Sequence, residues 1–157
     1  MKQHFLQDRD LSEMYEKFFA EHLNMQWNKT RSNDRGVDIY DHLDTLDVKV
    51  YRKPRFGEYE GFFIETYLPL SNNPGWFCDP KKINNGYLLV KDAYVEEVKY
   101  DKAWIITKYD LTQAIAEARR DAKELGLDDL PLKKIESGWG YILPYKYIEK
   151  YGFEVII

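Results

Sequence analysis

The stretch GVDIYDHLDTLDVKVY, residues 36–51, has the pattern of a β-hairpin. Its two arms, Val37 to Tyr40 and Leu46 to Tyr51, are rich in the β-branched and aromatic residues that favour strands. The polar residues 41–45 between the arms suit a turn. We therefore expect two antiparallel strands here, and the acids that they carry are the starting point for predicting a function.

Alternation decides which side chains of the second arm share a face. Asp47, Lys49 and Tyr51 lie on one face, because successive side chains of a strand point to opposite sides of the sheet. The other face, which we expect to lie in the core, carries Leu46, Val48 and Val50. A turn centred near residues 42 and 43 brings Asp38 opposite Asp47 or Lys49. Two carboxylates at such close range repel each other, and a divalent cation relieves that repulsion.

The rest of the chain alternates helical and strand-like patterns. Apolar residues recur at helical spacing in residues 10–23 and again, most clearly, in residues 110–126. Shorter patterns predict strands at residues 62–68, 87–90, 102–107, 141–143 and 152–157, and a short helix at residues 144–150. This order predicts an α+β fold with a single mixed central sheet flanked by helices. The length fits one domain, so we expect residues 1–157 to form a single domain.

Capping residues predict the ends of the two longer helices. Asp10 or Ser12 can cap the N-terminus of the first helix. In the second helix, Asp110 is the expected N-cap, with Gln113 in the position of a capping box. Gly126 is the expected C-cap of that helix.

Composition narrows the classes of function. Hydrophobic residues make up 44% of the chain, so it can bury a core and is not expected to be disordered. The formal charge of −4 argues against a non-specific polycationic nucleic-acid binder, but not against a nuclease, whose cation neutralises an acidic metal site. Cys78 is the only cysteine, and we expect it to be a small buried residue instead of a nucleophile. The sequence has neither a signal-peptide pattern nor a long apolar run, which predicts a cytoplasmic protein without a membrane partner.

An acid, a hairpin turn and then (D/E)-x-K on the next strand, after a helix that bears an acid, resembles the PD-(D/E)XK nuclease superfamily. Asp38 matches the first acid, Asp47 the second and Lys49 the lysine. Val37 stands in place of the proline that gives the motif its name. Further along, FFIETYLPLSNNPGWFC and NNGYLLV resemble small phage and mobile-element members, in which a Gly-Trp turn follows an acid-bearing strand and precedes a Tyr-rich one. The resemblance covers roughly residues 10 to 110.

The resemblance implies a restriction-endonuclease-like core that hydrolyses phosphodiester bonds with Mg²⁺ or Mn²⁺. Asp38 and Asp47 would hold the metal, and Val48 would offer it a backbone carbonyl. Lys49 would orient the attacking water or stabilise charge on the phosphate being cleaved. The resemblance therefore predicts a Mg²⁺-dependent endonuclease, located in the host cytoplasm if a phage encodes it.

Two further acids belong to the predicted site. Glu16 or Glu13, on the first helix, would match the helix glutamate that many members of the superfamily add as a metal ligand. Glu65 lies among apolar residues on the strand after the lysine. A carboxylate in such a strand is costly to bury unless it is paired or bound to a metal, so we place Glu65 among the catalytic residues.

Basic residues lie on both sides of the predicted site. Arg52, Lys53 and Arg55 follow the Asp-x-Lys strand, and Arg35 precedes Asp38. Because a phosphate backbone must lie at the site, we expect these four residues to bind nucleic acid, with DNA as the expected partner. Further contacts from the Gly-Trp loop would come from Lys81, Lys82, Trp76 and Phe77.

Two other interpretations of the same residues stay open. In the first, the fold lacks catalysis and serves a phage or mobile element as a binding protein for nucleic acid or a host protein. Its interface would consist of the C-terminal aromatic residues Trp139, Tyr141, Tyr145, Tyr147 and Tyr151. In the second, the hairpin is incidental to an unrelated α+β protein, and Asp38 and Asp47 face opposite sides of the sheet. If the protein is a nuclease, a homodimer is plausible because one site cuts one strand and double-strand cleavage needs two.

Overall fold

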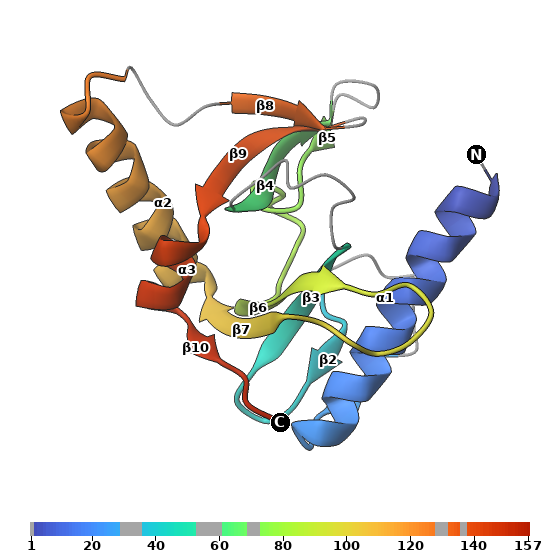
Figure 1. The fold of residues 1–157 in the computed structure, drawn as a ribbon. Coiled ribbons are helices and arrows are strands. Elements are labelled where there is room, and N and C mark those ends of the chain that lie inside the picture. Colours follow the sequence, from blue (N-terminus) through green and yellow to red (C-terminus); the bar gives the residue numbers. More distant parts are fainter. Residues whose placement is uncertain (1, 29–35, 53–60, 69–72, 128–131, 136–137) are drawn as a thin grey trace.

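The computed structural model describes residues 2–28, 36–52, 61–68, 73–127, 132–135 and 138–157. These residues form an α+β fold of three helices and two sheets, which confirms the predicted fold class at that level (Figure 1). The helices are α1 (Lys2–His22), α2 (Lys108–Glu124) and α3 (Tyr145–Tyr151). None of these helices combines the length and the apolar character needed to cross a membrane.

The larger sheet has six strands in the order β1-β2-β3-β6-β7-β10. The strands are β1 (Gln26–Trp27), β2 (Ile39–Tyr40), β3 (Thr45–Arg52), β6 (Gly86–Ala93), β7 (Lys102–Thr107) and β10 (Phe153–Glu154). β3 and β6 run parallel, whereas the other neighbours in this sheet are antiparallel. The mixed central sheet that the sequence predicts is therefore confirmed.

A second sheet corrects the prediction that there is only one. It has the order β5-β4-β9-β8 and antiparallel pairing throughout. Its strands are β4 (Gly61–Leu68), β5 (Asn73–Pro74), β8 (Leu132–Ile135) and β9 (Gly138–Pro144). Both edges of β3 are already occupied, by β2 and by β6, so β4 cannot join the larger sheet beside β3 and pairs with β9 instead.

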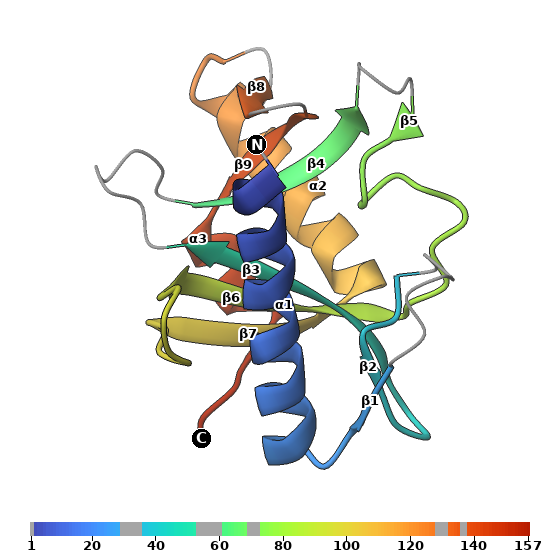
Figure 2. The ribbon, with the colours of Figure 1, turned by 90° about the vertical axis from the view of Figure 1, so that its right-hand side faces the viewer.

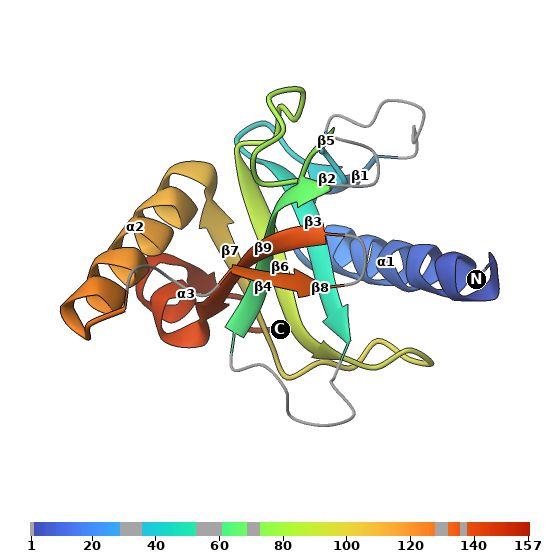
Figure 3. The same ribbon diagram turned by 90° about the horizontal axis from the view of Figure 1, so that it is seen from above.

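Apolar clusters cover both faces of the larger sheet. On one face α1 packs through residues such as Tyr15 and Phe19 against Val48 of β3 (Figure 2). On the other face α2, α3 and the second sheet pack around Trp104 and Phe62. Seen from above, α1 lies on one side of the strands and α2 with α3 on the other (Figure 3). The sheet is therefore an inner layer of the fold.

Burial on both sides explains the composition of the inner strands. In β6, Tyr87, Leu88, Leu89 and Val90 are all completely buried, which is the uniform apolar run expected of a strand covered on both faces. In β3 the predicted alternation is confirmed. Leu46 and Val48 are buried in the α1 cluster, and Val50 packs against the same cluster.

The helix ends differ from the predicted ones. α1 begins at Lys2, so Asp10 and Ser12 lie inside it, because residues 2–10 contain no glycine or proline to stop it. The N-cap of α2 is Thr107, whose side chain accepts a hydrogen bond from the backbone N–H of Asp110. Asp110 is therefore an acid in the first turn and not the cap.

The C-terminus of α2 follows the prediction closely. Leu125 is the C-cap, and Gly126 follows it with a φ of +87°, which suits glycine. The amide of Leu127 donates to the carbonyl of Ala122, and that of Gly126 to Lys123, as in a Schellman motif.

Three short strands, β1, β5 and β8, were not predicted. β1 and β5 have two residues each, which is too short for an alternating pattern to appear in the sequence. Their pairing partners decide their conformation: β1 pairs with β2, and β5 with β4.

The Tyr15 hydroxyl ties α1 to the turn between β6 and β7. Tyr15 is completely buried, and its hydroxyl accepts the backbone N–H groups of Tyr94 and Lys99, each at 3.1 Å. It donates to the carbonyl of Lys99 at 2.6 Å. Burial raises the pKa of this phenol, although the hydrogen bonds to Lys99 and Tyr94 lower it, so it stays a neutral donor. One side chain thus satisfies polar backbone groups of a turn far away in sequence.

We expect Tyr15→Phe to lower the free energy of unfolding by about 1–3 kcal/mol, because the turn loses the hydrogen bonds that the Tyr15 hydroxyl makes with its backbone, including the one from the Lys99 amide. Urea denaturation followed by circular dichroism measures the difference. Tyr109→Phe is the matched control. Tyr109 is 71% exposed, so removal of its hydroxyl should lower the free energy of unfolding by less than about 0.5 kcal/mol. Equal stability of Tyr15→Phe and the wild type would contradict the proposed role of the hydroxyl.

Candidate functional site

The hairpin of β2 and β3 brings Asp38 and Asp47 together. Ile39 pairs with Leu46, and this register places Asp38, just before β2, across from Asp47. The backbone N–H of Asp38 donates to the carbonyl of Leu46 at 2.9 Å. The amide of Val48 donates to Oδ2 of Asp38 at 2.8 Å. The two acids therefore share one site and do not face opposite sides of the sheet, as they would in an incidental hairpin.

Asp38 is in an environment that resists its ionisation. Burial, followed by the neighbouring carboxyl groups of Asp47 and Glu16, raises its pKa to about 8, even though the Val48 amide favours the charged form. Without a cation, a proton on Asp38 relieves the repulsion near neutral pH. Glu16 of α1 and Asp47 of β3 thus both act electrostatically on Asp38, which precedes β2.

Asp47 is buried, to the same extent as Glu16. Its residue is only 4% exposed, and its Oδ2 atom is in contact with the Lys49 ammonium alone among the interactions that the described residues give it. Nζ of Lys49 lies 3.4 Å from the same oxygen as an ion pair. A buried carboxylate oxygen in this state has an unfilled capacity to accept a hydrogen bond or to bind a cation.

Glu16 comes from α1 and lies on the helix side of the site. Only 4% of this residue is exposed, and its Oε1 accepts a hydrogen bond from the indole N–H of Trp27 at 3.2 Å. Of the two predicted helix glutamates, Glu16 is the one that raises the pKa of Asp38. Glu13 lies one turn earlier in the same helix and is partly buried.

Lys49 lies on the same face of β3 as Asp47, as the alternation predicts. Burial lowers its pKa, but the carboxyl groups of Asp47, Asp38 and Glu65 raise it more, so its pKa is above the ordinary value. The side chain is therefore a cation at neutral pH, partly exposed at the edge of an acidic site.

Glu65 of β4 completes the acidic surroundings of Lys49. Burial raises its pKa, whereas Lys49 and a hydrogen bond from the backbone N–H of Trp76 lower it. Glu65 is partly exposed, so it is not the deeply buried carboxylate that its apolar neighbours suggested. Its position across from Lys49 comes from the second sheet, which places β4 over the face of β3 that carries the charges.

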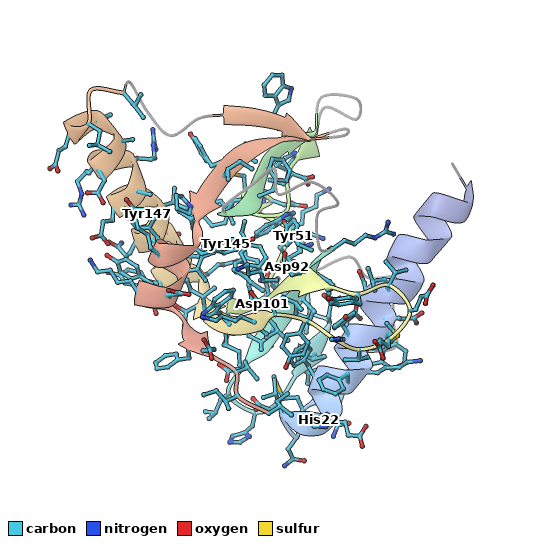
Figure 4. The ribbon with its side chains drawn as sticks, viewed as in Figure 1. His22, Tyr51, Asp92, Asp101, Tyr145 and Tyr147 are labelled. Atoms are coloured by element: carbon cyan, nitrogen blue, oxygen red, sulfur yellow. The ribbon has the colours of Figure 1, made fainter. Side chains whose placement is uncertain are left out.

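Three aromatic residues lie beside these charges, and the sequence predicts a role at the site for only one of them, Trp76, as a contact for nucleic acid. Tyr51, on the same face of β3, donates a hydrogen bond to the carbonyl of Phe63 and lies between the two sheets (Figure 4). Tyr87 is the partner of Asp47 in the parallel register, and it is completely buried. The ring of Trp76 lies 5.2 Å from Nζ of Lys49. Alternation along β3 predicts that Tyr51 lies on the face of Asp47 and Lys49. The positions of Tyr87 and Trp76 depend instead on the register between strands and on the path of a loop, and no local pattern encodes these.

The predicted nucleic-acid-binding residues are mostly outside the described part of the chain. Arg35, Lys53 and Arg55 lie in ranges that the structure does not describe. Arg52 is described and is partly buried at the end of β3. Of the lysines in the Gly-Trp loop, Lys81 is exposed and Lys82 partly buried.

Two further predictions are tested by burial. Cys78 is exposed, so the expectation of a small buried residue was wrong. Cys78 comes directly after Trp76 and Phe77, whose side chains pack against the core. The side chain of Cys78 is left at the surface. Tyr147 is buried, and the aromatic residues that pack partly buried against the same core include Tyr141, Tyr145 and Tyr151. These four residues therefore contribute to the packing of the core.

The side chains at this site are of the type that binds divalent cations. Carboxylate oxygens are the ligands that Mg²⁺ and Mn²⁺ prefer, and Oδ2 of Asp47 has unfilled capacity beside Asp38. The described residues contain no group of three or more His, Cys, Asp and Glu side chains arranged as a ready metal site. The fit therefore rests on two facing acids, with Glu16 as a third acid on the helix side.

No protein-family model matches this sequence, and no curated protein is significantly similar to it. Membership of the PD-(D/E)XK superfamily therefore stays a prediction from the hairpin and its surroundings.

The pKa of Asp38 leads to a pH dependence of stability. Between pH 3.8, its ordinary pKa, and about pH 8, the folded protein keeps a proton that the unfolded chain has lost. The free energy of unfolding should therefore fall as pH rises through this window. Asp38→Asn, which keeps an oxygen for the Val48 amide, should raise the free energy of unfolding near pH 8 by several kcal/mol, since the pKa of Asp38 is shifted from 3.8 to about 8 and each unit is worth ~1.4 kcal/mol.

Urea denaturation at about pH 5 and about pH 8, with a chelator present, measures this effect. Asp44→Asn is the matched control, because it removes an acid of the same hairpin outside the site. A variant Asp38→Asn that is no more stable than the wild type near pH 8 would show that the buried charge costs nothing.

Proposed function

We propose that this protein is a nuclease that hydrolyses phosphodiester bonds of nucleic acid with Mg²⁺ or Mn²⁺, as the resemblance to PD-(D/E)XK enzymes implies. The observation that carries the proposal is the facing pair Asp38 and Asp47, with a buried oxygen on Asp47 whose neighbour is the Lys49 ammonium, 3.4 Å away. A structural salt bridge needs only one acid for one lysine. The surplus of carboxylates suits a site that is completed by a cation.

Asp38 and Asp47 would hold the cation, with Glu16 as a further ligand or support and the Val48 carbonyl as a ligand by analogy. Bound there, a divalent cation supplies a Lewis acid for the phosphate and lowers the pKa of a coordinated water. Asp38 must then be ionised, and its raised pKa means that it releases its proton on binding. Cation affinity should consequently weaken as pH falls.

Lys49 would orient the attacking water and stabilise negative charge on the phosphate. Its raised pKa keeps it an ammonium at neutral pH, so it acts as a donor and a positive charge, not as a base. Glu65 would keep Lys49 in place from the opposite sheet, and it is the acid available to accept a proton near the site. Nucleic acid, with DNA as the first candidate, would approach along the basic residues that flank the hairpin.

Cleavage of plasmid and single-stranded DNA with Mn²⁺ or Mg²⁺ should be detectable for the wild type and abolished by a chelator. Asp47→Asn should reduce the rate by about 10³-fold or more, and Lys49→Met by about 10²- to 10³-fold, since each removes a charge that acts on the transition state. Gel electrophoresis of a labelled substrate measures both rates. Asp44→Asn serves as the control and should cleave at the wild-type rate.

Calorimetric titration with Mn²⁺ provides a readout that does not depend on activity. Binding by the wild type that is lost in Asp38→Asn supports the cation site. Binding without cleavage of DNA or RNA would favour the alternative, a catalytically inactive binding protein. Full activity of Asp47→Asn would overturn the assignment of the site.

A further inference from the structure

The turn at residues 75–77 is fixed firmly to β4. The backbone N–H of Gly75 donates to the carbonyl of Thr66 at 2.9 Å, and that of Phe77 to the carbonyl of Glu65 at 3.2 Å. The backbone N–H of Trp76 lowers the pKa of Glu65 through a hydrogen bond. All three backbone amides of the turn are thus directed at two residues of one strand, and the turn cannot shift without losing them.

Gly75 makes this close approach feasible. A Cβ atom at position 75 would lie 2.5 Å from the backbone carbon and oxygen of Glu65, far inside van der Waals contact. Gly75 is buried, so any larger residue would have to push the turn away from β4. The absence of a side chain here therefore sets the position of the next residue, Trp76.

Trp76 is held by contacts on several sides. Its ring packs edge-on against Tyr87 with centroids 5.0 Å apart, and against Phe77 at 6.2 Å. A side-chain hydrogen bond links Trp76 to Tyr51. The indole thus has a defined orientation over the face that β3 and β6 share, and its face is directed at Nζ of Lys49, 5.2 Å away.

Lys49 is consequently restrained from two directions. Oδ2 of Asp47 attracts its ammonium at 3.4 Å, and the Trp76 ring lies on another side as a cation–π partner. A lysine has a flexible four-carbon stem, so an ion pair alone leaves its ammonium several orientations. The ring reduces that freedom, because leaving it forfeits a partly desolvated contact.

We infer that Trp76, fixed by the 75–77 turn, is a positioning residue that holds the Lys49 ammonium beside Asp47 for the reaction. This role rests on the proposed function, in which Lys49 acts on the phosphate and the attacking water. Trp76 acts through Lys49, so its loss should lower kcat and leave KM nearly unchanged. The expected fall in kcat for Trp76→Leu is on the order of 10-fold, and Trp76→Phe, which keeps an aromatic face, should restore most of it.

Carbon–proton NMR of the lysine side chains tests the placement without any need for activity. The ε-methylene signal of Lys49, assigned by its disappearance in Lys49→Met, should be shifted upfield in the wild type by the ring current of Trp76. The shift should vanish in Trp76→Leu and persist in Trp76→Phe. An ordinary lysine position for this signal in the wild type would overturn the inference, whether or not any variant folds.

Kinetic measurements then test whether Trp76 contributes to the reaction. Tyr94→Leu is the matched control, because it removes another cation–π pair, with Lys99 at 5.0 Å, at the turn between β6 and β7. It should leave kcat unchanged. If Trp76→Leu loses the ring-current shift but keeps the wild-type kcat, the positioning role is wrong. If the wild type cleaves no nucleic acid, the proposed function fails, and the role of Trp76 in the reaction fails with it. The NMR signal still decides separately whether Trp76 holds Lys49.

Discussion

The parallel pairing of β3 with β6 is the contact on which the rest of the structure depends. It makes β3 an inner strand, with β2 on one edge and β6 on the other. α1 then covers one face of β3, and the second sheet covers the other. A strand in that position is normally apolar on both faces, yet β3 carries Asp47 and Lys49 on the face toward the second sheet.

This conflict between packing and charge produces the chemistry of the site. Because Asp47 is buried, its charge is poorly solvated and acts strongly on Asp38 and Lys49. The same carboxylates at the protein surface would be screened and would hardly influence each other. The fold therefore spends stability at this point, which is typical of a functional site and unusual for a purely structural one.

Much of the hairpin could be predicted from the sequence because its geometry is local. Alternation alone places Asp47 and Lys49 on one face of β3 and Val48 on the other, and a short turn brings Asp38 near. Trp76 and Tyr87 could not be assigned to the site in this way. Their positions depend on the register between β3 and β6 and on the path of the chain through the second sheet, and neither leaves a periodic signal.

The errors in the prediction have a common cause. The single sheet, the cap at Asp110 and the buried Cys78 were each inferred from local residue preferences. For the first two, a partner distant in sequence or an equally good neighbour decided the outcome: β4 pairs with β9, and Thr107, three residues before Asp110, caps α2. For Cys78, its neighbours Trp76 and Phe77 pack against the core and Cys78 is left exposed. Local preference is a weak determinant where such competitors exist.

The parallel pairing also has a consequence for the order in which the site forms. The β2–β3 hairpin closes through a short turn, whereas the pairing of β3 with β6 requires the intervening chain to cross over first. Contacts between distant segments generally form late in folding, because the entropy of closing a long loop opposes them. We therefore expect the folding chain to bring the two acids together in open solvent before β6, Trp76 and the second sheet enclose them. A divalent cation that binds the open hairpin would then accelerate folding as well as stabilise its product.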